Sequence, residues 1–387
     1  MDLSRYFDYH ATTPVDPRVL EAMLPFFTAH FGNAASRNHR FGWAAAEAVD
    51  RARAQVADLI HARHSDIVFT SGATEGNNLA IKGVVQARRG RGNHVVTVAT
   101  EHPSVLDTCR ALARDGIEVT VLPVGHDGLV DPVEVARVVT ERTILVSVMT
   151  ANNEIGVLQP VEDIAQLCRA LGVVFHTDAS QAIGKVPFDV ERIGADLVSF
   201  TAHKFYGPKG VGALWVRRKS VEVAIQMHGG GHERGLRSGT LNVPGIVGLG
   251  QACELCRLEG AEEARRLGAL RDRLLASLRA RVPDLIVNGS LAHRLPQNLN
   301  VSFPGIDAES LAIAMDGVAI SSGSACSTGK PKPSAVLKAL GLCDDLAFAS
   351  LRFGLGRWTT EEGVDFVVEK TASVVTRLRE VRAALDG

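Results

Sequence analysis

The sequence lacks the hydrophobic segments of a membrane or secreted protein. Its N-terminal residues, MDLSRYFDYH, are polar and do not resemble a signal peptide. No stretch approaches the roughly 20 apolar residues that a membrane helix needs. The six cysteines are scattered, without the spacing of a disulfide framework. We therefore expect a cytoplasmic protein with no membrane partner.

The chain also lacks a strong charge of either sign. With 42 Lys and Arg residues against 43 Asp and Glu residues, its formal net charge is -1. Bulk electrostatics therefore predict no direct nucleic-acid partner. Hydrophobic residues make up 46% and charged residues 22%, which is an ordinary globular balance. Because single cores stop growing at roughly 250–300 residues, a chain of 387 residues predicts two packed domains.

Short β-branched segments alternate with amphipathic helical ones. Residues 43–60, for example, carry Val49 and Val56 on one helical face. Such alternation predicts βαβ units and an α/β fold with a mainly parallel sheet between helices. Strands are expected at residues 66–70, 94–100, 143–149, 172–178, 195–203 and 212–216.

The pattern of predicted helices and strands changes after about residue 255. A charged helical stretch, two strand-like segments and a C-terminal helix follow, which predicts a smaller α+β domain. We assign residues 15–262 to the large domain, and residues 1–14 and 263–387 to the small one. A segment rich in Gly, Ser, Lys and Pro, at about residues 321–334, is expected to be a mobile loop of the small domain.

Lys204 and Asp178 each lie at the end of a predicted strand. A lone lysine there is usually a surface residue, and a lone aspartate is usually a helix N-cap. In parallel sheets, however, ligands bind beyond the carboxyl ends of the strands, where both residues lie. A lysine that holds pyridoxal phosphate (PLP), with a carboxylate that keeps the pyridine nitrogen protonated, would make the ring an electron sink. Gln181 can donate to the ring oxygen.

Two glycine-containing segments can hold the phosphate. Residues 69–78, FTSGATEGNN, predict a strand, a turn and a helix start, where free N–H groups and the helix dipole favour an anion. Thr74 adds a hydroxyl there. Residues 229–240 contain several glycines together with Arg234 and Arg237, although a solvated interdomain loop is the alternative interpretation.

Ten sequence blocks resemble one enzyme family. In chain order they are FDYHATTPVDPRV, FGNAASRNHRFGW, FTSGATEGNNLAIKG, TEHPSVLDTC, ANNEIGVLQP, HTDASQAIGK, TAHKFYGPKGVGAL, GGGHERGLRSGTLNV, SSGSACSTG and LRFGLGRWTTEE. Together, from about Tyr6 to Thr360, they look like a group I cysteine desulfurase of the IscS/NifS type. That group contains class V aminotransferase-like enzymes of PLP fold-type I, which form homodimers. The resemblance implies a large domain with a mainly parallel, seven-stranded sheet between helices and a smaller α+β domain.

The resemblance implies a role for each matching residue. Those around the ring are Lys204 (covalent attachment), Asp178 (pyridine nitrogen), Gln181 (ring oxygen) and His102 (stacking on the ring). The phosphate ligands are Ala73, Thr74, Thr201 and His203, together with Thr240 from the neighbouring subunit. The substrate contacts are Arg352, which binds the carboxylate, Asn153, which also contacts the cofactor, and Asn33.

Cys326 matches the family's persulfide-forming cysteine. Lys330 and Lys332 follow it in the sequence and would favour its thiolate. The resemblance implies that L-cysteine becomes L-alanine: Lys204 takes the α-proton, His102 accepts or relays the substrate thiol proton, and Cys326 captures the sulfur. Acceptor proteins in iron–sulfur cluster assembly or tRNA thiolation would then receive the sulfur. No metal site is predicted, apart from Cys326 as a possible transient cluster ligand.

Other interpretations remain open at this level. A selenocysteine lyase, another class V PLP enzyme, or a sulfur-delivery platform for a specialised pathway such as DNA modification would share most of these blocks. Cys253 and Cys256 form a C-x-x-C pair, which we interpret as structural because it lies in helical sequence. The chain stops soon after its last predicted helix, which leads us to expect weaker docking of a standard scaffold protein.

Overall fold

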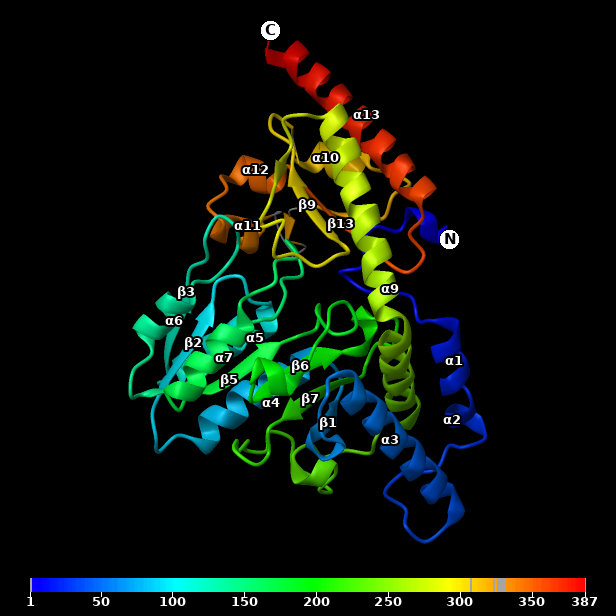
Figure 1. Cartoon of the computed structure of the whole chain (residues 1–387), viewed down its shortest axis with the longest axis vertical. Helices are drawn as coiled ribbons and strands as arrows, with labels where there is room; N and C mark the ends of the chain where they lie inside the picture. Colours follow the sequence, from blue (N-terminus) through cyan, green and yellow to red (C-terminus); the bar gives the residue numbers. More distant parts are fainter. Residues whose placement is uncertain (1, 307, 323, 326–331, 387) are drawn as a thin grey trace.

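The computed structural model describes residues 2–306, 308–322, 324–325 and 332–386. Figure 1 shows two parts, a larger lower one built on a central sheet and a smaller upper one that contains the C-terminus. The long helix α9 (Val243–Arg281) runs through both. Among the described helices, none combines the length and the apolarity needed to cross a membrane.

The central sheet has seven strands, as predicted, in the order β1-β7-β6-β5-β4-β2-β3. Strands β3, β2, β4, β5 and β6 are parallel, whereas β7 is antiparallel to both of its neighbours. The α/β fold class is therefore confirmed. The strands are β1 (Ile67–Thr70), β2 (His94–Val98), β3 (Glu118–Leu122), β4 (Thr143–Ser147), β5 (Val174–Asp178), β6 (Leu197–Thr201) and β7 (Gly212–Val216).

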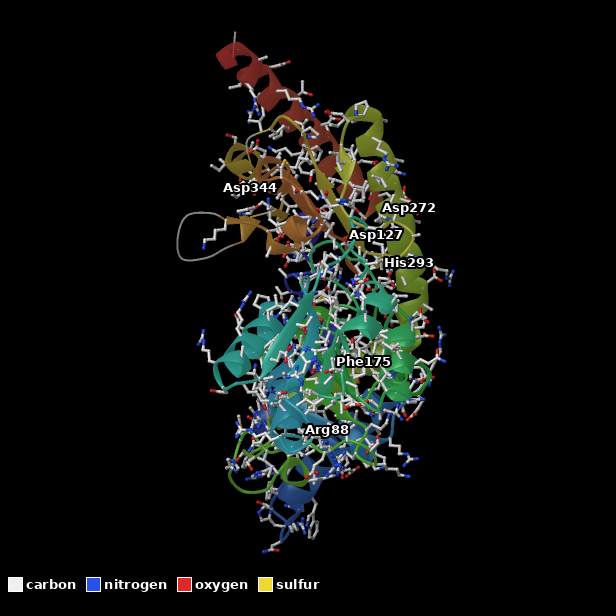
Figure 2. The ribbon with its side chains drawn as sticks, turned by 90° about the vertical axis from the view of Figure 1, so that its left-hand side faces the viewer. Arg88, Asp127, Phe175, Asp272, His293 and Asp344 are labelled. Carbon is white, nitrogen blue, oxygen red and sulfur yellow. The ribbon has the colours of Figure 1, made fainter. Side chains whose placement is uncertain are left out.

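Helices cover both faces of this sheet. On one face, α4 and α5 bury residues such as Leu79, Val84 and Val105 against the strands. The other face packs against α3, α7 and the first half of α9. The helices of this part are α1 (Pro17–Met23), α2 (Pro25–Thr28), α3 (Arg40–Leu59), α4 (Ala73–Ala87), α5 (Pro103–Arg114), α6 (Pro132–Val138), α7 (Val161–Ala170) and α8 (Val190–Ile193). In the side-chain view, Phe175 of β5 lies inside this lower part (Figure 2) and is fully buried.

Helix α9 contributes to two separate cores. Its first half buries Leu249 and Cys253 against the sheet layer, and its second half buries Leu274 and Leu278 in a different hydrophobic cluster. Cys253 and Cys256 are both buried in its first half, and no metal-binding cluster occurs among the described residues. We propose that the boundary between the two domains lies within this helix, close to residue 262.

The second core surrounds a small antiparallel sheet in the order β10-β13-β9-β8. Phe7, from the start of the chain, is buried in this core, and Asp8 bridges to Gly354 of the sheet. The remaining elements are β8 (Ile286–Val287), β9 (Asn298–Ser302), α10 (Ala308–Ala314), β10 (Ser321–Ser322), β11 (Ser324–Ala325), β12 (Lys332–Pro333), α11 (Ala335–Ala339), α12 (Asp344–Phe348), β13 (Ser350–Gly354) and α13 (Glu361–Asp386).

Candidate active site

A cavity of about 640 Å³, here called the Lys204 cavity, lies beyond the carboxyl ends of the central strands. Its walls come from segments that follow β1, β2, β4, β5 and β6, as expected for a parallel sheet. The predicted site residues that line it are Ala73, Thr74, His102, Asn153, Asp178, Gln181, Thr201, His203, Lys204 and Arg352. Thr240 and Asn33 do not line it, and Cys326 lies outside the described residues.

Lys204 ends a short 3-10 helix, Ala202–Lys204, that directly follows β6. Its Nζ donates hydrogen bonds to the carbonyl oxygens of His10 (2.7 Å) and Ala11 (2.8 Å). Burial, together with the positive charge of Arg352, lowers the pKa of Lys204 to about 8. Near physiological pH, a larger fraction of Lys204 is therefore neutral than of an exposed lysine. A nucleophilic or proton-accepting amine must be neutral.

Asp178 is buried at the end of β5, and each of its carboxylate oxygens accepts a hydrogen bond. Oδ2 accepts a hydrogen bond from Asn77 Nδ2 (2.7 Å), and Oδ1 accepts one from the backbone N–H of Ser180 (2.9 Å). Residues 179–186 form turns, so Asp178 caps no helix. These contacts fix the carboxylate in the cavity wall.

His102 is tied to Asp178 by two side chains that the sequence did not single out. Ser104 Oγ lies 2.8 Å from His102 Nδ1 and also accepts from Asn77 Nδ2 (2.8 Å), which in turn binds Asp178. The backbone N–H of Ser104 also donates to His102 Nδ1 (3.1 Å). A backbone N–H can only donate, so Nδ1 is unprotonated and the neutral ring carries its proton on Nε2. Burial lowers the pKa of His102, which favours this neutral ring.

Glu101, directly before His102, is a second buried carboxyl group beside this network. One oxygen accepts a hydrogen bond from the backbone N–H of Met149, and Oε2 has no partner among the described residues. Burial and the negative charge of Asp178 raise the pKa of Glu101 well above its usual range. The raised pKa favours the protonated form of Glu101 beside Asp178.

The opposite end of the cavity is built for an anion. Helix α4 begins after Gly72, and no side chain caps its first turn. Its free N–H groups and its dipole favour a negative group beside Thr74. Thr201, His203 and Lys209 also line the cavity. Glu75 of this first turn binds Arg237 (2.7 Å), which connects the glycine-rich segment 229–240 to the start of α4.

Arg352 of β13 brings a guanidinium group from the small sheet into the cavity. It donates to the backbone oxygen of Asn153 (3.0 Å), to Asp8 Oδ1 (2.7 Å) and to Ser321 Oγ (2.7 Å). Its Nε is buried without a partner among the described residues. An unpaired donor on a cavity-lining guanidinium suits a carboxylate ligand.

Asn33 lies in the segment between α2 and α3. Its side chain accepts a hydrogen bond from the backbone N–H of Ala35 (2.9 Å), so it caps a local turn. Large apolar side chains are exposed on these helices and the connections between them: Leu20, Leu24, Phe27, Phe31, Phe41 and Trp43. Helices α1, α2 and α3 form the lower right of Figure 1, at the edge of the molecule.

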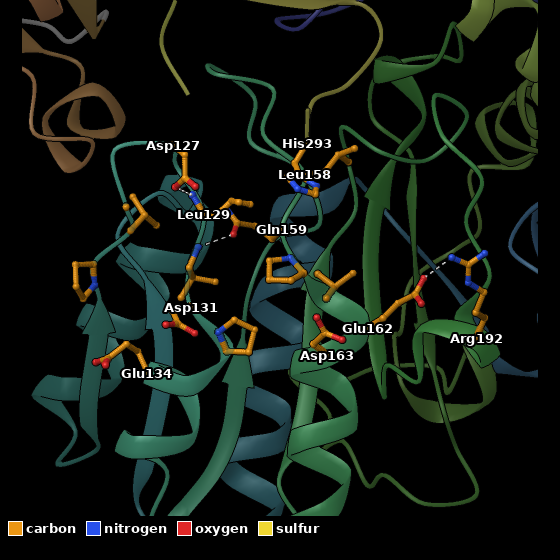
Figure 3. Close-up of a pocket in the computed structure, with 17 residues that line it drawn as sticks. Asp127, Leu129, Asp131, Glu134, Leu158, Gln159, Glu162, Asp163, Arg192 and His293 are labelled. Atoms are coloured by element: carbon orange, nitrogen blue, oxygen red, sulfur yellow. Dashed lines mark hydrogen bonds and ion pairs between the residues drawn. The ribbon is translucent and has the colours of Figure 1, made fainter. Parts of the chain in front are cut away.

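A larger hollow of about 910 Å³, here called the acidic cavity, lies near β3, α6 and α7 (Figure 3). Its carboxylates are Asp127, Asp131, Glu134, Glu162 and Asp163. Most of them are already bonded: for example, Asp131 caps α6 through the backbone N–H of Val133 (2.8 Å), and Glu162 pairs with Arg192 (2.9 Å). Size alone therefore does not make this hollow the active site.

Comparisons with known proteins identify the family of this chain. A model of the family described as "Aminotransferase class-V" matches residues 5–367. The chain belongs to this family. "Cysteine desulfurase IscS" of Anaeromyxobacter sp. (strain Fw109-5) is 59% identical over 382 residues, which cover 98% of this chain and 95% of that protein. The resemblance to IscS/NifS-type cysteine desulfurases that the sequence blocks predicted is confirmed.

Two solved structures extend the likeness to three dimensions. A NifS-like protein superposes with a TM-score of 0.90 at 39% identity, and the match covers 96% of this chain and 99% of that one. A structure titled "SspA in complex with cysteine" superposes with a TM-score of 0.81 at 35% identity, covering 92% and 100% of the two chains. Both cover nearly the whole chain, so the class V family fold extends over both cores.

Proposed function

We propose that this protein is a PLP-dependent cysteine desulfurase that converts L-cysteine to L-alanine and holds the released sulfur as a persulfide on Cys326. The observation that carries the proposal is the convergence of Lys204, Asp178, His102 and Arg352 on one cavity. Membership of the IscS/NifS group and the likeness to a protein solved with cysteine support L-cysteine as the substrate.

The cavity fits PLP at both of its ends. The uncapped start of α4 offers N–H groups for the phosphate, and Thr74 and His203 add side chains that can donate. Thr201, whose hydroxyl donates to the backbone oxygen of Val211 (3.3 Å) in this structure, lines the same cavity. At the ring end, Asp178 suits a protonated pyridine nitrogen, and Ser180 Oγ is buried with no partner among the described residues. When bound, PLP supplies a ring that withdraws the electron pair left at the substrate's α-carbon.

Side chains of the protein then bind the substrate and transfer its protons. Arg352 binds the substrate carboxylate, and Asn153 lies beside it. Lys204, whose pKa is lowered to about 8, takes the α-proton at its Nζ. Because Nδ1 of His102 accepts hydrogen bonds from Ser104 and the ring proton lies on Nε2, any proton that His102 exchanges with the substrate passes through Nε2.

Cys326 is proposed as the sulfur acceptor from its place in the matched sequence. The thiolate forms an S–S bond with the substrate sulfur while the C–S bond breaks, and the β-carbon takes up a proton to give alanine. The sulfur is oxidised as the carbon is reduced, so no outside oxidant is needed. The persulfide would then pass to an acceptor protein of iron–sulfur assembly or tRNA thiolation.

We also propose a homodimer, since two predicted site residues lie away from the cavity of their own chain. Thr240 and Asn33 would reach the partner's cavity across an interface formed in part by the exposed apolar residues of α1–α3. The five described cysteines are all unpaired, which suits the reducing cytoplasm that we propose as the compartment.

The test compares two cysteine variants of the purified holoenzyme. Cys326→Ala should keep the visible band of bound PLP but form no persulfide with L-cysteine, as measured by mass spectrometry of the intact protein. The matched control is Cys343→Ala, which removes an exposed cysteine of the small domain and should leave persulfide formation unchanged. Sulfur transfer by Cys326→Ala at the wild-type rate would refute the assignment, and activity confined to selenocysteine would favour the lyase alternative.

A further inference from the structure

A chain of buried hydrogen bonds runs from the small sheet to the Lys204 cavity and begins at Arg294. Its guanidinium donates through Nη1 to Asn298 Oδ1 (2.9 Å). The opposite side of the Asn298 amide faces the backbone oxygen of Glu154, with Nδ2 at 3.2 Å. A guanidinium can only donate and a carbonyl oxygen can only accept, so both contacts fix the Asn298 amide in the same orientation.

The position of Asn298 leaves its amide no room to turn. It lies fully buried at the start of β9, and a Cβ added to Gly156 would come within 2.3 Å of the Asn298 amide carbon. The backbone of Gly156 therefore packs directly against this side chain. The other hydrogen of Nδ2 points at His10 Nε2, 3.1 Å away.

His10 is the middle member of the chain and is a neutral imidazole. Its side chain is fully buried, and the positive charges of Arg352, Lys204 and Lys185 add to burial in lowering its pKa to about 3. Because Asn298 donates to Nε2, the single ring proton lies on Nδ1. Nδ1 lies 2.9 Å from Gln181 Oε1, so it donates to that oxygen.

Gln181 confirms this direction from the other end. Its Nε2 donates to the backbone oxygen of His10 (3.0 Å), which can only accept. The Oε1 atom therefore faces His10 Nδ1 and must accept. One hydrogen of Nε2 is left over, and Gln181 lines the Lys204 cavity. The same backbone oxygen of His10 also accepts from Lys204 Nζ (2.7 Å).

We propose that Arg294, Asn298 and His10 form a one-way hydrogen-bond chain that fixes the Gln181 amide with its N–H, rather than its oxygen, toward the cavity. These three are positioning residues, because they act on a ligand through Gln181. The proposal rests on the proposed function, in which Gln181 faces the ring oxygen of PLP. It means that the small sheet sets the hydrogen-bond character of a cavity wall in the large domain.

Asn298→Asp is the sharpest change, since it keeps the shape and the bond to Arg294 while replacing the donor at His10 with an acceptor. The ring proton of His10 should then move to Nε2, and Gln181 should turn its oxygen toward the cavity, giving up its hydrogen bond to the backbone oxygen of His10. The matched control is Asn300→Asp, which alters another buried asparagine of β9 whose Nδ2 also binds the Glu154 oxygen (3.2 Å) without contacting His10.

The first measurement is ¹⁵N NMR of histidine-labelled protein without cofactor, with His10→Gln used to assign the signals. The wild type and Asn300→Asp should show a protonated Nδ1 and an unprotonated Nε2, and Asn298→Asp should show a protonated Nε2. A wild-type His10 protonated on Nε2, or an unchanged signal in Asn298→Asp, would overturn the proposal. The wild-type spectrum decides the direction even where the variant fails to fold.

The second measurement is the pH midpoint of the visible band of the PLP-loaded protein. The midpoint should rise in Asn298→Asp, because Gln181 no longer donates to the ring oxygen, and it should stay at the wild-type value in Asn300→Asp. A reversed His10 proton with an unchanged midpoint would refute the link to Gln181. A wild type that binds no PLP would instead refute the proposed function, while the NMR result still judges the hydrogen-bond chain.

Discussion

The Lys204 cavity and the acidic cavity are both polar hollows beside the same central sheet, and the acidic one is the larger. In the acidic cavity, carboxylates already have partners within the protein: Asp131 caps α6, and Glu162 forms an ion pair with Arg192. In the Lys204 cavity, Asp178 is held by Asn77, whereas Ser180 Oγ and Arg352 Nε have no hydrogen-bond partner among the described residues. The comparison shows that volume alone does not mark the site, because the smaller cavity is the one that brings Lys204, Asp178, His102 and Arg352 together.

The largest expected effect comes from Lys204→Ala. It removes the amine that we propose for covalent attachment and for the α-proton, so turnover of L-cysteine should fall to background. Absorption spectra should show PLP bound without its covalent link. Lys209→Ala, a lysine of the same cavity wall, should keep that link. Covalent attachment of PLP that survives in Lys204→Ala would show that another residue holds the cofactor.

The pH dependence of cofactor loading should also set Lys204 apart from an ordinary lysine. Only the neutral amine attacks a carbonyl group, and burial lowers the pKa of Lys204 from 10.5 to about 8. The rate at which the apoprotein attaches PLP should therefore rise with pH and level off above about pH 8. Stopped-flow absorbance measures this rate. A rate that keeps rising toward the ordinary lysine pKa of about 10.4 would contradict the buried, cation-flanked environment.

Asn77→Ala should have the next largest effect, because it removes the side chain that holds Asp178 from behind. A hydrogen bond to a charged group contributes about 1.5–3 kcal/mol. PLP affinity, measured by equilibrium titration, should therefore weaken roughly ten- to a hundredfold. Asn78→Ala is the neighbouring control, since its half-buried side chain binds the backbone oxygen of Thr74 and makes no bond to Asp178 among the described residues. Equal losses in both variants would argue against a specific support for Asp178.

Asp131→Ala should give the smallest effect, and only on stability. Loss of the cap of α6 costs about 1 kcal/mol of the free energy of unfolding. Urea unfolding measures this loss, and Asp131→Asn should largely restore the cap. PLP affinity should not change in either variant. A loss of affinity would show that the acidic cavity takes part in the chemistry after all.

The sequence predicted the residues that face the Lys204 cavity better than those that support them. Lys204, Asp178 and His102 follow strands, so a parallel sheet alone brings them together. Asn77 and Asn298 act across chain separations of 101 and 288 residues, which no local pattern reveals.

The fold shows the same division. The buried strands were expected, although the predicted carboxyl ends of β2, β4 and β6 ran two residues too far, because the chain turns toward the cavity there. The predicted starts of β5 and β6 were also two residues too early. Strand β3 was not singled out, because it lies at the sheet edge with most of its residues partly exposed. The continuity of α9 was also missed: its two halves bury their apolar residues in different cores, so no single pattern spans the helix.

The central claim is that Lys204 carries PLP in this protein. Borohydride reduction of the PLP-loaded protein fixes the cofactor to the amine that holds it, and peptide mass spectrometry then locates the label. The account predicts a single pyridoxyl group on the peptide that contains Lys204, lost after prior incubation of the protein with hydroxylamine. A label on Lys209 or Lys185, or no label on any lysine, would contradict it.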